Sequence, residues 1–443
     1  MRLHDAEQHD PTLSRRLAAA VAELLADDRI RRATGGHPEL RADDERQLAR
    51  RLVAGELDDL AAGRLRAGLD PLDPEDESLL ADSVLDAVLG LGRIQPLLDD
   101  PDVNDIHIRG CEPVWLKLRN GERVRSTPVV STDEELVELI RRAAARTGRA
   151  ERRLDAANPE LNLQLPDGSR LFAAIEVSAR PTVVIRRHRF ELSTLAQLED
   201  RGLVDLALRD FLSAAVRARR NLVIAGGTGT GKTTLLRALL NEVPPDERIV
   251  TIEDAYELGV DRFGDAHPDH DMLQSRPANI EGRGEITLLD LTRMALRMDP
   301  DRVVVGEVRG AEAFPMLLAM SQGNNGSMCS MHADSSRSVF PKLAAYVSMS
   351  ETGLPVDTVN LLIANAVHFV IQIEHVDGVR RITSVREAVD ADGARIVSNE
   401  VFRPGPDGWA VPGYPMRDTT ALLLERHGFD LTLLDRSDGW WVE

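Results

Sequence analysis

The chain has 443 residues, of which 43% are hydrophobic and 29% charged, and its formal net charge is −19. This length predicts about three domains with room for at least one large core, and the acidic balance argues against a general nucleic-acid-binding surface, which needs clustered Lys and Arg. No apolar run approaches the roughly 20 residues that span a bilayer, and the polar first residues lack the apolar core of a signal peptide. The two cysteines, Cys111 and Cys329, lie far apart in the sequence and predict neither a disulfide framework nor a metal site, which favours a reducing cytoplasm.

The first ninety residues are predicted to form a helical region, a small bundle. Apolar residues recur at helical spacing in residues 17–25 and again in residues 79–88. Segments with Gly and Pro at residues 35–38 and 70–74 punctuate this part of the chain. Its charged faces are typical of solvated helices, and no chemistry is assigned to them.

Residues 91–187 are predicted to form a small α+β domain. Asn120-Gly121 is a hairpin turn signal, and Pro166-Asp167-Gly168 separates a second pair of strand-like runs. An amphipathic helix is expected over residues 134–145, and residues 188–200 are expected to be a linker. Strands are predicted over residues 103–108, 114–118, 161–165, 170–175 and 182–186.

Residues 226–233 match the phosphate-binding loop pattern G-x-x-x-x-G-K-[ST] at every fixed position. An apolar strand at 221–225 precedes the loop and strong helix formers at 234–240 follow it, so a chance match of a glycine-rich turn is disfavoured. Glycines let the backbone turn tightly and aim its N–H groups at phosphate oxygens, and the helix start adds its positive dipole end. In such a loop the lysine reaches the β- and γ-phosphates and the hydroxyl after it binds Mg²⁺. The residues expected to bind the nucleotide are Gly226, Gly227, Thr228, Gly229, Thr230, Gly231, Lys232, Thr233 and Thr234.

Strands and helices alternate over residues 201–390, which predicts an α/β domain with a parallel sheet and crossover helices. Further strands are expected over residues 248–252, 302–305 and 326–331. Residues 367–373 and 379–385 are expected to form a terminal hairpin through Asp377-Gly378. Residues 391–443 are then a tail with a short amphipathic stretch at 420–427.

Polar residues follow three of the predicted strands directly. Glu253 ends one strand, Glu307 follows the next, and His332 follows a third. Each is a weak signal alone, since strand-end Glu and His residues are commonly caps or surface groups. The ligand crevice of an open parallel sheet lies beyond the carboxyl ends of its strands, so these residues are expected to converge on the phosphate loop.

These motifs together resemble the secretion-superfamily ATPases that power type II and type IV secretion and pilus assembly, and most nearly the tight-adherence (Tad/Flp) pilus ATPases, the CpaF-like family. The resemblance covers about residues 90–390. It rests on residues 226–234, on 252–258 (Ile-Glu-Asp-Ala-Tyr-Glu-Leu), on 276–282 (Arg-Pro-Ala-Asn-Ile-Glu-Gly), on 301–313 and on 326–334. It implies a RecA-like motor domain that uses ATP and Mg²⁺, a preceding domain that clamps the nucleotide, and a homo-hexameric ring.

The resemblance also implies roles for individual residues. Glu253 would orient or deprotonate the attacking water and Glu307 would hold Mg²⁺ through water, although physical reasoning alone permits the exchange of these two roles. His332 is similar to the histidine that senses the γ-phosphate; the alternative is a buried histidine satisfied by a carbonyl.

Arginines come from two places in the chain. Arg170 and Arg186 resemble arginines of the preceding domain that close over the phosphates; the alternative is ordinary surface charge. Nothing local selects among four further arginines that could act between subunits, Arg276, Arg293, Arg297 and Arg309.

Three departures from the family pattern are visible. Asn324 stands where many relatives have a second histidine, and it cannot carry charge. Pro315 replaces an acidic residue near an expected helix start, where proline is tolerated. Two cysteines cannot build the four-cysteine metal site of the pilus-extension and type II branches, which favours the tight-adherence or conjugative branch.

The expected function is therefore a cytoplasmic ATPase ring that drives a pilus or secretion machine at the inner membrane. Membrane association would come through an integral platform protein, and no direct nucleic-acid contact is expected. One alternative is a conjugative secretion ATPase. A second, motivated by Asn324, is a nucleotide-gated binding module with little hydrolysis.

Overall fold

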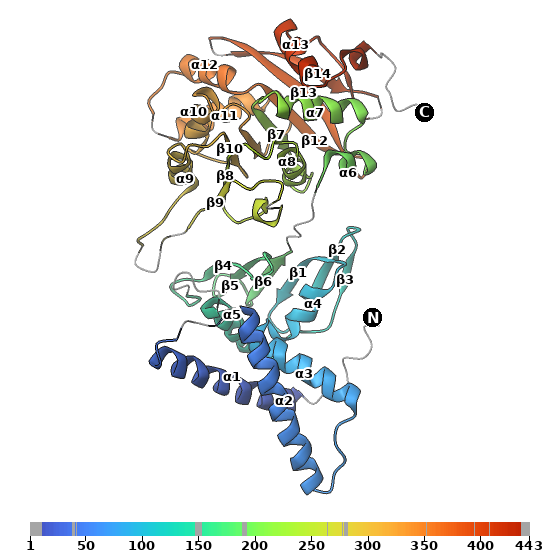
Figure 1. Cartoon of the computed structure of the whole chain (residues 1–443), viewed down its shortest axis with the longest axis vertical. Helices are drawn as coiled ribbons and strands as arrows, with labels where there is room; N and C mark the ends of the chain where they lie inside the picture. The colour runs from blue at the N-terminus through green and yellow to red at the C-terminus, as the bar shows by residue number, and fades with distance from the viewer. Residues whose placement is uncertain are drawn as a thin grey trace. The chain divides into compact units, whose positions relative to one another are not determined.

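The computed structural model describes residues 11–435 apart from 38, 39, 41, 147–152, 188–192, 264, 277, 279–281, 351, 394 and 407. The chain divides into two compact units, Met1–His188 and Arg189–Glu443, whose elements are labelled in Figure 1. Each unit has its own hydrophobic core.

The first unit begins with three helices that pack against one another, as the helical spacing predicts. They are α1 (Pro11–Thr34), α2 (Ala42–Arg66) and α3 (Pro74–Leu89). Leu17 and Val21 of α1, Val53 of α2 and Val84 of α3 are buried in one cluster. Apolar residues that recur every three or four positions give each helix an apolar face, and these faces pack together in the bundle.

The rest of the first unit is a six-stranded antiparallel sheet in the order β3-β2-β1-β6-β5-β4. Its strands are β1 (Val103–Arg109), β2 (Trp115–Leu118), β3 (Arg123–Arg125), β4 (Glu160–Gln164), β5 (Arg170–Ala174) and β6 (Thr182–Arg186). The short helices η1 (Gly92–Ile94) and α4 (Gln95–Asp99) and the longer α5 (Asp133–Arg146) add apolar side chains to the core on one face of the sheet. Both predicted hairpins, β2–β3 and β4–β5, are confirmed.

The second unit contains a nine-stranded sheet in the order β15-β14-β13-β12-β7-β11-β10-β8-β9. Six of its strands are β7 (Leu222–Gly226), β8 (Ile249–Glu253), β9 (His270–Gln274), β10 (Arg302–Val305), β11 (Met328–Met331) and β12 (Phe369–Val376). These six pair in parallel, with the strand that leads into the phosphate loop between β12 and β11. The central strands are buried on both faces and therefore read as continuous apolar runs.

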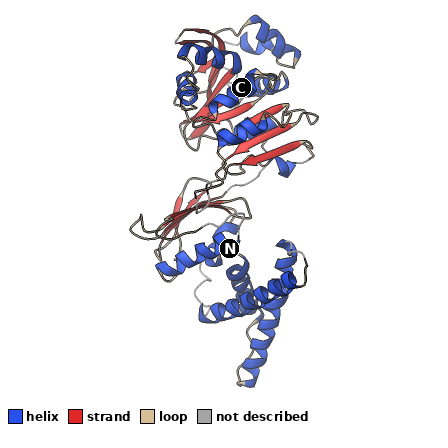
Figure 2. Cartoon of the chain, turned by 90° about the vertical axis from the view of Figure 1, so that its left-hand side faces the viewer, coloured by secondary structure: helices blue, strands red, loops and turns tan. Residues whose placement is uncertain are grey.

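Helices cover both faces of this sheet (Figure 2). One face packs against α6 (Leu195–Asp200), α7 (Leu206–Arg217), α8 (Lys232–Leu240) and α13 (Asp418–Arg426). The other face packs against α9 (Leu288–Ala295), α10 (Ala313–Ser321), α11 (Val339–Ser348) and α12 (Val356–Ala366). The short helices η2 (Val260–Phe263) and η3 (Leu431–Asp435) complete the unit. This architecture confirms the predicted α/β fold class of a RecA-like P-loop domain with a preceding α+β domain.

The segment that the sequence suggests as a tail adds strands to the same sheet. β13 (Val379–Asp392) pairs antiparallel with β14 (Arg395–Pro404), and β14 pairs with β15 (Ala410–Pro412). Phe211 of α7 makes edge-to-face contacts with Phe369, Phe402 and Phe429, at centroid distances of 5.0, 5.3 and 5.6 Å. The sequence did not predict these added strands, because the Pro- and Gly-rich turns between them have the same composition as an irregular tail.

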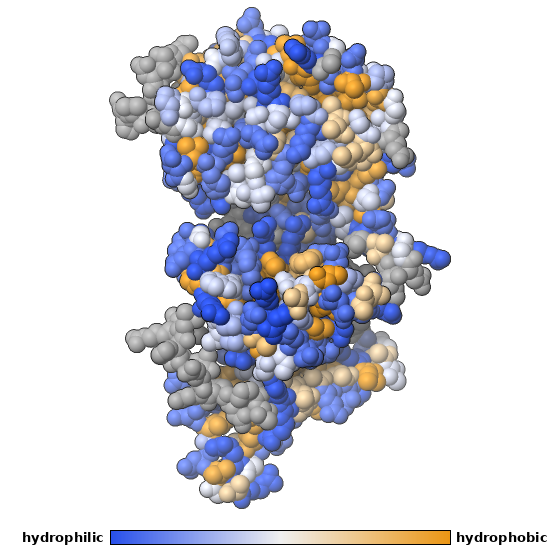
Figure 3. Space-filling view, turned by 180° about the vertical axis from the view of Figure 1, so that it is seen from behind, coloured by the Kyte–Doolittle hydropathy of each residue, from blue (hydrophilic) through white to orange (hydrophobic). Residues whose placement is uncertain are grey.

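The surface of the second unit carries a group of exposed apolar side chains at α11–α12. Met349, Leu354, Val356 and Leu361 are exposed, and apolar residues gather along one side of this unit in Figure 3. Among the described residues, no helix is long and apolar enough to cross a membrane.

Candidate functional site: a phosphate loop at the carboxyl edge of the parallel sheet

The phosphate loop joins the end of β7 to the start of α8. Gly226 needs to be glycine, because a Cβ there would lie 2.5 Å from the carbonyl oxygen of Ile373. Gly229 and Gly231 have φ values of 76° and 103°, in the region that favours glycine. α8 begins at Lys232, so the amides of its first turn face the loop.

The ammonium group of Lys232 is held by three contacts at the loop. Its Nζ donates to the carbonyl oxygens of Gly226 and Gly227, at 3.1 and 2.8 Å, and lies 3.3 Å from Nδ1 of His332. Burial lowers the pKa of Lys232, and the nearby charge of Glu307 opposes that shift. A partly desolvated ammonium fixed beside a phosphate loop is well placed to contact phosphate oxygens.

His332 connects Lys232 to Glu307. Its Nε2 lies 2.7 Å from Oε1 of Glu307. Nδ1 therefore accepts from the ammonium while Nε2–H donates to the carboxylate, which requires the neutral imidazole protonated on Nε2. The exposed fractions of the two side chains, 42% and 37%, show that both are partly open to solvent. His332 is thus not a core histidine satisfied by a carbonyl.

Glu253 ends the neighbouring strand β8 and is only 3% exposed. Its Oε1 accepts hydrogen bonds from the backbone N–H groups of Glu257 and Leu258, both at 2.9 Å. Its buried Oε2 has no hydrogen-bond partner among the described residues. Burial raises the pKa of Glu253 to about 7, while the two backbone hydrogen bonds act in the opposite direction. Such a carboxyl group is poised to exchange a proton near neutral pH.

Backbone contacts bring these strand ends to one edge. The N–H of Gly306 donates to the Ile252 carbonyl at 2.9 Å, and the hydroxyl of Ser330 donates to the Gly306 carbonyl at 2.6 Å. A Cβ at Gly306 would lie 3.1 Å from Cγ of Glu253, so glycine leaves room for the carboxylate. The structure therefore brings Lys232, Glu253, Glu307 and His332 to the same edge of the sheet.

These residues suit a nucleoside triphosphate with Mg²⁺. Thr233 follows Lys232 in the first turn of α8, and Glu307 offers a carboxylate in the crevice. Hydroxyl and carboxylate oxygens are the ligands that Mg²⁺ prefers. Oε2 of Glu253, at the end of the neighbouring strand β8, is buried and has no hydrogen-bond partner among the described residues.

Arg170 and Arg186 lie on the antiparallel sheet of the first unit, directly opposite each other on β5 and β6. Arg186 is also directly opposite Asp105 on β1, and Asp105 is directly opposite Lys117 on β2. Residues directly opposite each other point to the same side, so these side chains share one face of the sheet. Nε of Arg186 lies 3.2 Å from Oδ1 of Asp105. The predicted arginines therefore form part of a largely cationic row.

Two of the four other arginines have side-chain contacts within the chain. Arg309 forms an ion pair with Asp254, which joins the ends of β10 and β8. Nε of Arg276 donates to the Gly284 carbonyl at 2.9 Å. Within the segment 276–282, residues 277 and 279–281 lie outside the described residues.

The departures from the family pattern are local. Pro315 lies in the first turn of α10, where a missing backbone N–H is tolerated. Asn324 precedes β11 and donates from Nδ2 to the Pro300 carbonyl, so it lies at the amino end of the strand whose carboxyl end leads to His332. Cys329 is buried and Cys111 half-buried. Within the described ranges, no group of three or more His, Cys, Asp or Glu side chains could hold a metal ion.

Two residues beside the phosphate loop were missed by the sequence analysis. Nε2 of His375 lies 3.3 Å from the Gly229 carbonyl oxygen, and a Cβ at Gly231 would lie 3.5 Å from Cδ of Arg380. Both come from the β12–β13 hairpin. The only available signal was the hairpin itself, because the sequence does not show that β12 pairs with β7.

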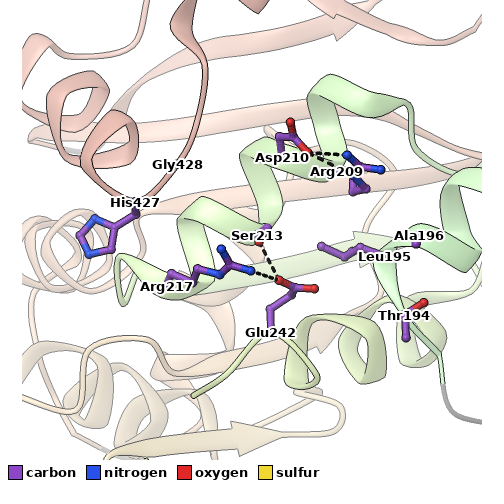
Figure 4. A pocket seen from close by; sticks show the side chains of 10 residues that line it. All are labelled: Thr194, Leu195, Ala196, Arg209, Asp210, Ser213, Arg217, Glu242, His427 and Gly428. Carbon is purple, nitrogen blue, oxygen red and sulfur yellow. Dashed lines mark hydrogen bonds and ion pairs between the residues drawn. The ribbon is translucent and has the colours of Figure 1, made fainter. Parts of the chain in front are cut away.

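A surface cavity of about 370 Å³ lies elsewhere in the second unit, at α6, α7 and the turn after α13 (Figure 4). Arg217 pairs there with Glu242 at 3.2 Å, and Arg209 pairs with Asp210 at 3.0 Å. None of the predicted site residues is among its described lining residues. Its cations are already neutralised, and we assign it no role.

The fold and the loop define a P-loop nucleotide-binding protein. More specifically, the chain belongs to the type II/IV secretion system protein family, whose model matches residues 89–391. A putative conjugal transfer protein of Mycobacterium tuberculosis is 36% identical over 314 residues, which are 69% of this chain and 86% of that protein. The type IV secretion system protein VirB11 of Brucella suis is 30% identical over 317 residues, which are 64% of this chain and 84% of that protein.

Solved structures of similar proteins include an ATPase and a pilus motor. The VirB11 ATPase of Brucella suis in complex with sulphate has 28% sequence identity and a TM-score of 0.36, with 67% of this chain and 95% of that chain covered. The pilus retraction motor PilT with bound ADP has 17% identity and a TM-score of 0.48, with 76% and 86% covered.

Proposed function

We propose that this chain is an ATP-hydrolysing motor of a pilus or secretion machine. One observation carries the proposal: Lys232, His332 and Glu307 form a continuous chain of contacts beside the phosphate loop. Membership of the type II/IV secretion system protein family supports it.

Each residue of the crevice has a proposed task. Lys232 and the loop amides bind the β- and γ-phosphates, and Thr233 and Glu307 hold Mg²⁺, the latter through water. When bound, Mg²⁺ neutralises charge that develops on the phosphates. His332 contacts the terminal phosphate region and reports its presence to Glu307.

Glu253 is the proposed base. The water oxygen bonds to the γ-phosphorus, the bond to the bridging oxygen breaks, and that electron pair leaves with ADP. The proton of the water passes to Oε2 of Glu253, which is buried and without a partner among the described residues. Its pKa of about 7 suits this transfer at neutral pH.

The proposed working state is a homo-hexamer of the tight-adherence type. A head-to-tail contact repeated by rotation closes into a ring, and the family resemblance suggests six members. Arg170 and Arg186, together with an arginine from a neighbouring subunit, would complete the charge around the phosphates. We propose a cytoplasmic ring at the inner face of the membrane, held there by an integral platform protein.

A conjugative secretion motor is the second candidate, because the similar protein of Mycobacterium tuberculosis is described as a putative conjugal transfer protein. Deletion of the gene in its host would separate the two candidates. Loss of surface pili with normal DNA transfer would support the pilus motor, and loss of DNA transfer with normal pili would support the conjugative one.

The activity is tested by ATP turnover of the purified chain and its Lys232→Ala variant. The variant should lose productive ATP binding and turnover, because a methyl group cannot offset charge on the phosphates. Arg395→Ala is a matched control, since Arg395 is an exposed cation on β14. Unchanged turnover in the Lys232 variant would overturn the assignment of the site, and a parent chain that binds ATP without turnover would favour the gated binding module.

The ring is tested by sedimentation and turnover over a dilution series. Turnover per chain should rise with protein concentration as assembly supplies the missing groups, and ATP should promote assembly. A chain that stays monomeric with ATP and keeps full turnover at every concentration would contradict the ring.

A further inference from the structure

The β12–β13 hairpin extends past the end of β7 and lies beside the phosphate loop. β12 pairs in parallel with β7 from Phe369 opposite Leu222 to Ile373 opposite Gly226. The next residues of β12, up to Val376, therefore continue where the loop begins. The close approach of Gly226 to the Ile373 carbonyl holds loop and hairpin together.

Two nitrogen-bearing side chains of this hairpin contact the loop. His375 and Arg380 are directly opposite each other in the β12–β13 register. Nε2 of His375 is 3.3 Å from the carbonyl oxygen of Gly229, which fits an N–H donor. The side chain of Arg380 packs over Gly231, with Cδ 3.5 Å from the position of a Cβ there.

The position of the hairpin indicates which end of the nucleotide it would meet. Glu307 and His332 follow β10 and β11, on one side of β7, and the proposed function assigns them to the terminal phosphate. β12 lies on the other side of β7. A nucleotide with its γ-phosphate toward Glu307 therefore has its α-phosphate toward the hairpin.

Charge favours Arg380 as the group that meets this phosphate. It is exposed, and none of the described residues forms an ion pair with it. Two acidic residues lie at the turn end of the hairpin: Glu374, whose Oε1 accepts a hydrogen bond from Nε2 of Gln372 at 3.4 Å, and Asp377 in the turn. An exposed guanidinium at a phosphate loop is suited to bind phosphate oxygens.

We propose that Arg380 is a further nucleotide-binding residue, which contacts the phosphates common to ATP and ADP, and that His375 positions the loop through Gly229. This inference rests on the proposed function, because it assumes that the loop binds a nucleotide. It predicts equal losses of affinity for ATP and ADP when Arg380 is replaced.

The experiment titrates ATP and ADP, each with Mg²⁺, into the full chain and its Arg380→Ala variant by calorimetry. Both dissociation constants should rise about tenfold, as expected for one charged hydrogen bond. Arg380→Lys should fall between the two. Arg395→Ala is the control and should change neither constant. Arg395 is an exposed cation that pairs with Asp392, at the end of β13 far from Arg380.

Two results would overturn the inference: unchanged binding of both nucleotides by Arg380→Ala, or weaker binding of ATP alone. His375→Ala should bind both nucleotides about threefold more weakly than the parent. His375→Gln keeps an N–H donor and should bind like the parent. Equal binding by the parent and both variants would show that His375 does not position the loop. Lys232→Ala separates this failure from failure of the proposed function: if that variant also binds normally, the loop itself is not the site.

Discussion

The two sheets bring functional side chains together in different ways. In the nine-stranded sheet, the carboxyl ends of parallel strands meet at one edge, so Lys232, Glu307 and His332 come within hydrogen-bonding distance although about 100 residues separate the first from the last. In the six-stranded antiparallel sheet, cations gather across the strands instead. That row runs through Gln164, Arg170, Arg186, Asp105, Lys117 and Arg123.

This difference decides what a sequence can predict. When strands and helices alternate along the chain, a residue that directly follows a buried strand can be assigned to the carboxyl edge of the parallel sheet. A residue within a cross-strand row is placed by register, which turns and bulges determine; the irregularity between Val103 and Asp105 is one example. Substitutions at the strand ends of the parallel sheet should therefore lower the rate of ATP hydrolysis. Substitutions in the cross-strand row should instead weaken the binding of ATP.

The largest effect is expected at the end of β8. Glu253→Gln should slow ATP turnover by about two orders of magnitude or more while ATP still binds, because the amide cannot accept the proton of the water. Steady-state turnover and nucleotide titration measure the two quantities. If Glu307→Gln spares Mg-ATP binding and shows the larger loss of turnover, the two carboxylates must exchange roles.

Glu253 should also make stability depend on pH. Its folded-state pKa of about 7 lies above the ordinary value of 4.5, so the folded protein retains a proton that the unfolded chain has released. Stability therefore falls as pH rises from about 4.5 to 7 and stays low above 7. Glu253→Gln lacks this loss and should be more stable than the parent at pH 8 by on the order of 3 kcal/mol, since one pKa unit corresponds to about 1.4 kcal/mol.

Thermal unfolding of parent and variant at pH 5 and pH 8 measures this difference. The stabilising effect of the substitution should be small at pH 5 and larger at pH 8. Equal differences at both values would show that Glu253 does not hold its proton in the folded protein. Asp86 and Asp205, whose pKa values burial raises to about 6, are present in both proteins and cancel in the comparison.

The cross-strand row should give a smaller effect. Arg186→Ala and Arg170→Ala are each expected to raise the KM for ATP about tenfold, as for loss of one charge-assisted contact to phosphate. Arg123→Ala removes a cation from the far end of the same row and is the control. If all three variants match the parent, the arginines are ordinary surface charge and the clamp proposal fails.

Sequence reasoning could place residues where a motif and its strand are contiguous. The phosphate loop, the two strand-end carboxylates and His332 all lie within a few residues of their strands. It failed where packing joins distant segments. Arg302 was predicted only as part of a strand, yet it is fully buried, with Nε and Nη2 donating to the Glu247 carboxylate at 2.7 and 2.9 Å.

The hairpin residues and the final strands illustrate the same limit. His375 and Arg380 reach the loop because β12 pairs with β7, a neighbour that lies about 150 residues earlier in the chain. Phe402 enters the core because β14 extends the sheet beyond the predicted hairpin. Neither pairing follows from local periodicity, since strand order is a property of the whole sheet.

The smallest effect is expected at Asn324, where the family pattern has a histidine. Asn324 lies before β11 and donates to the Pro300 carbonyl, at the amino end of strands whose carboxyl ends carry Glu307 and His332. Asn324→Ala should therefore change turnover by less than about threefold and lower stability by about 1 kcal/mol, the contribution of one hydrogen bond. Asn324→His should likewise leave turnover nearly unchanged. Turnover and thermal unfolding of both variants, compared with His332→Ala as a crevice control, provide the test. A tenfold change in turnover from Asn324→His in an intact assembly would mean that the amino edge of the sheet takes part in hydrolysis. The two ends of β11 would then not differ in function.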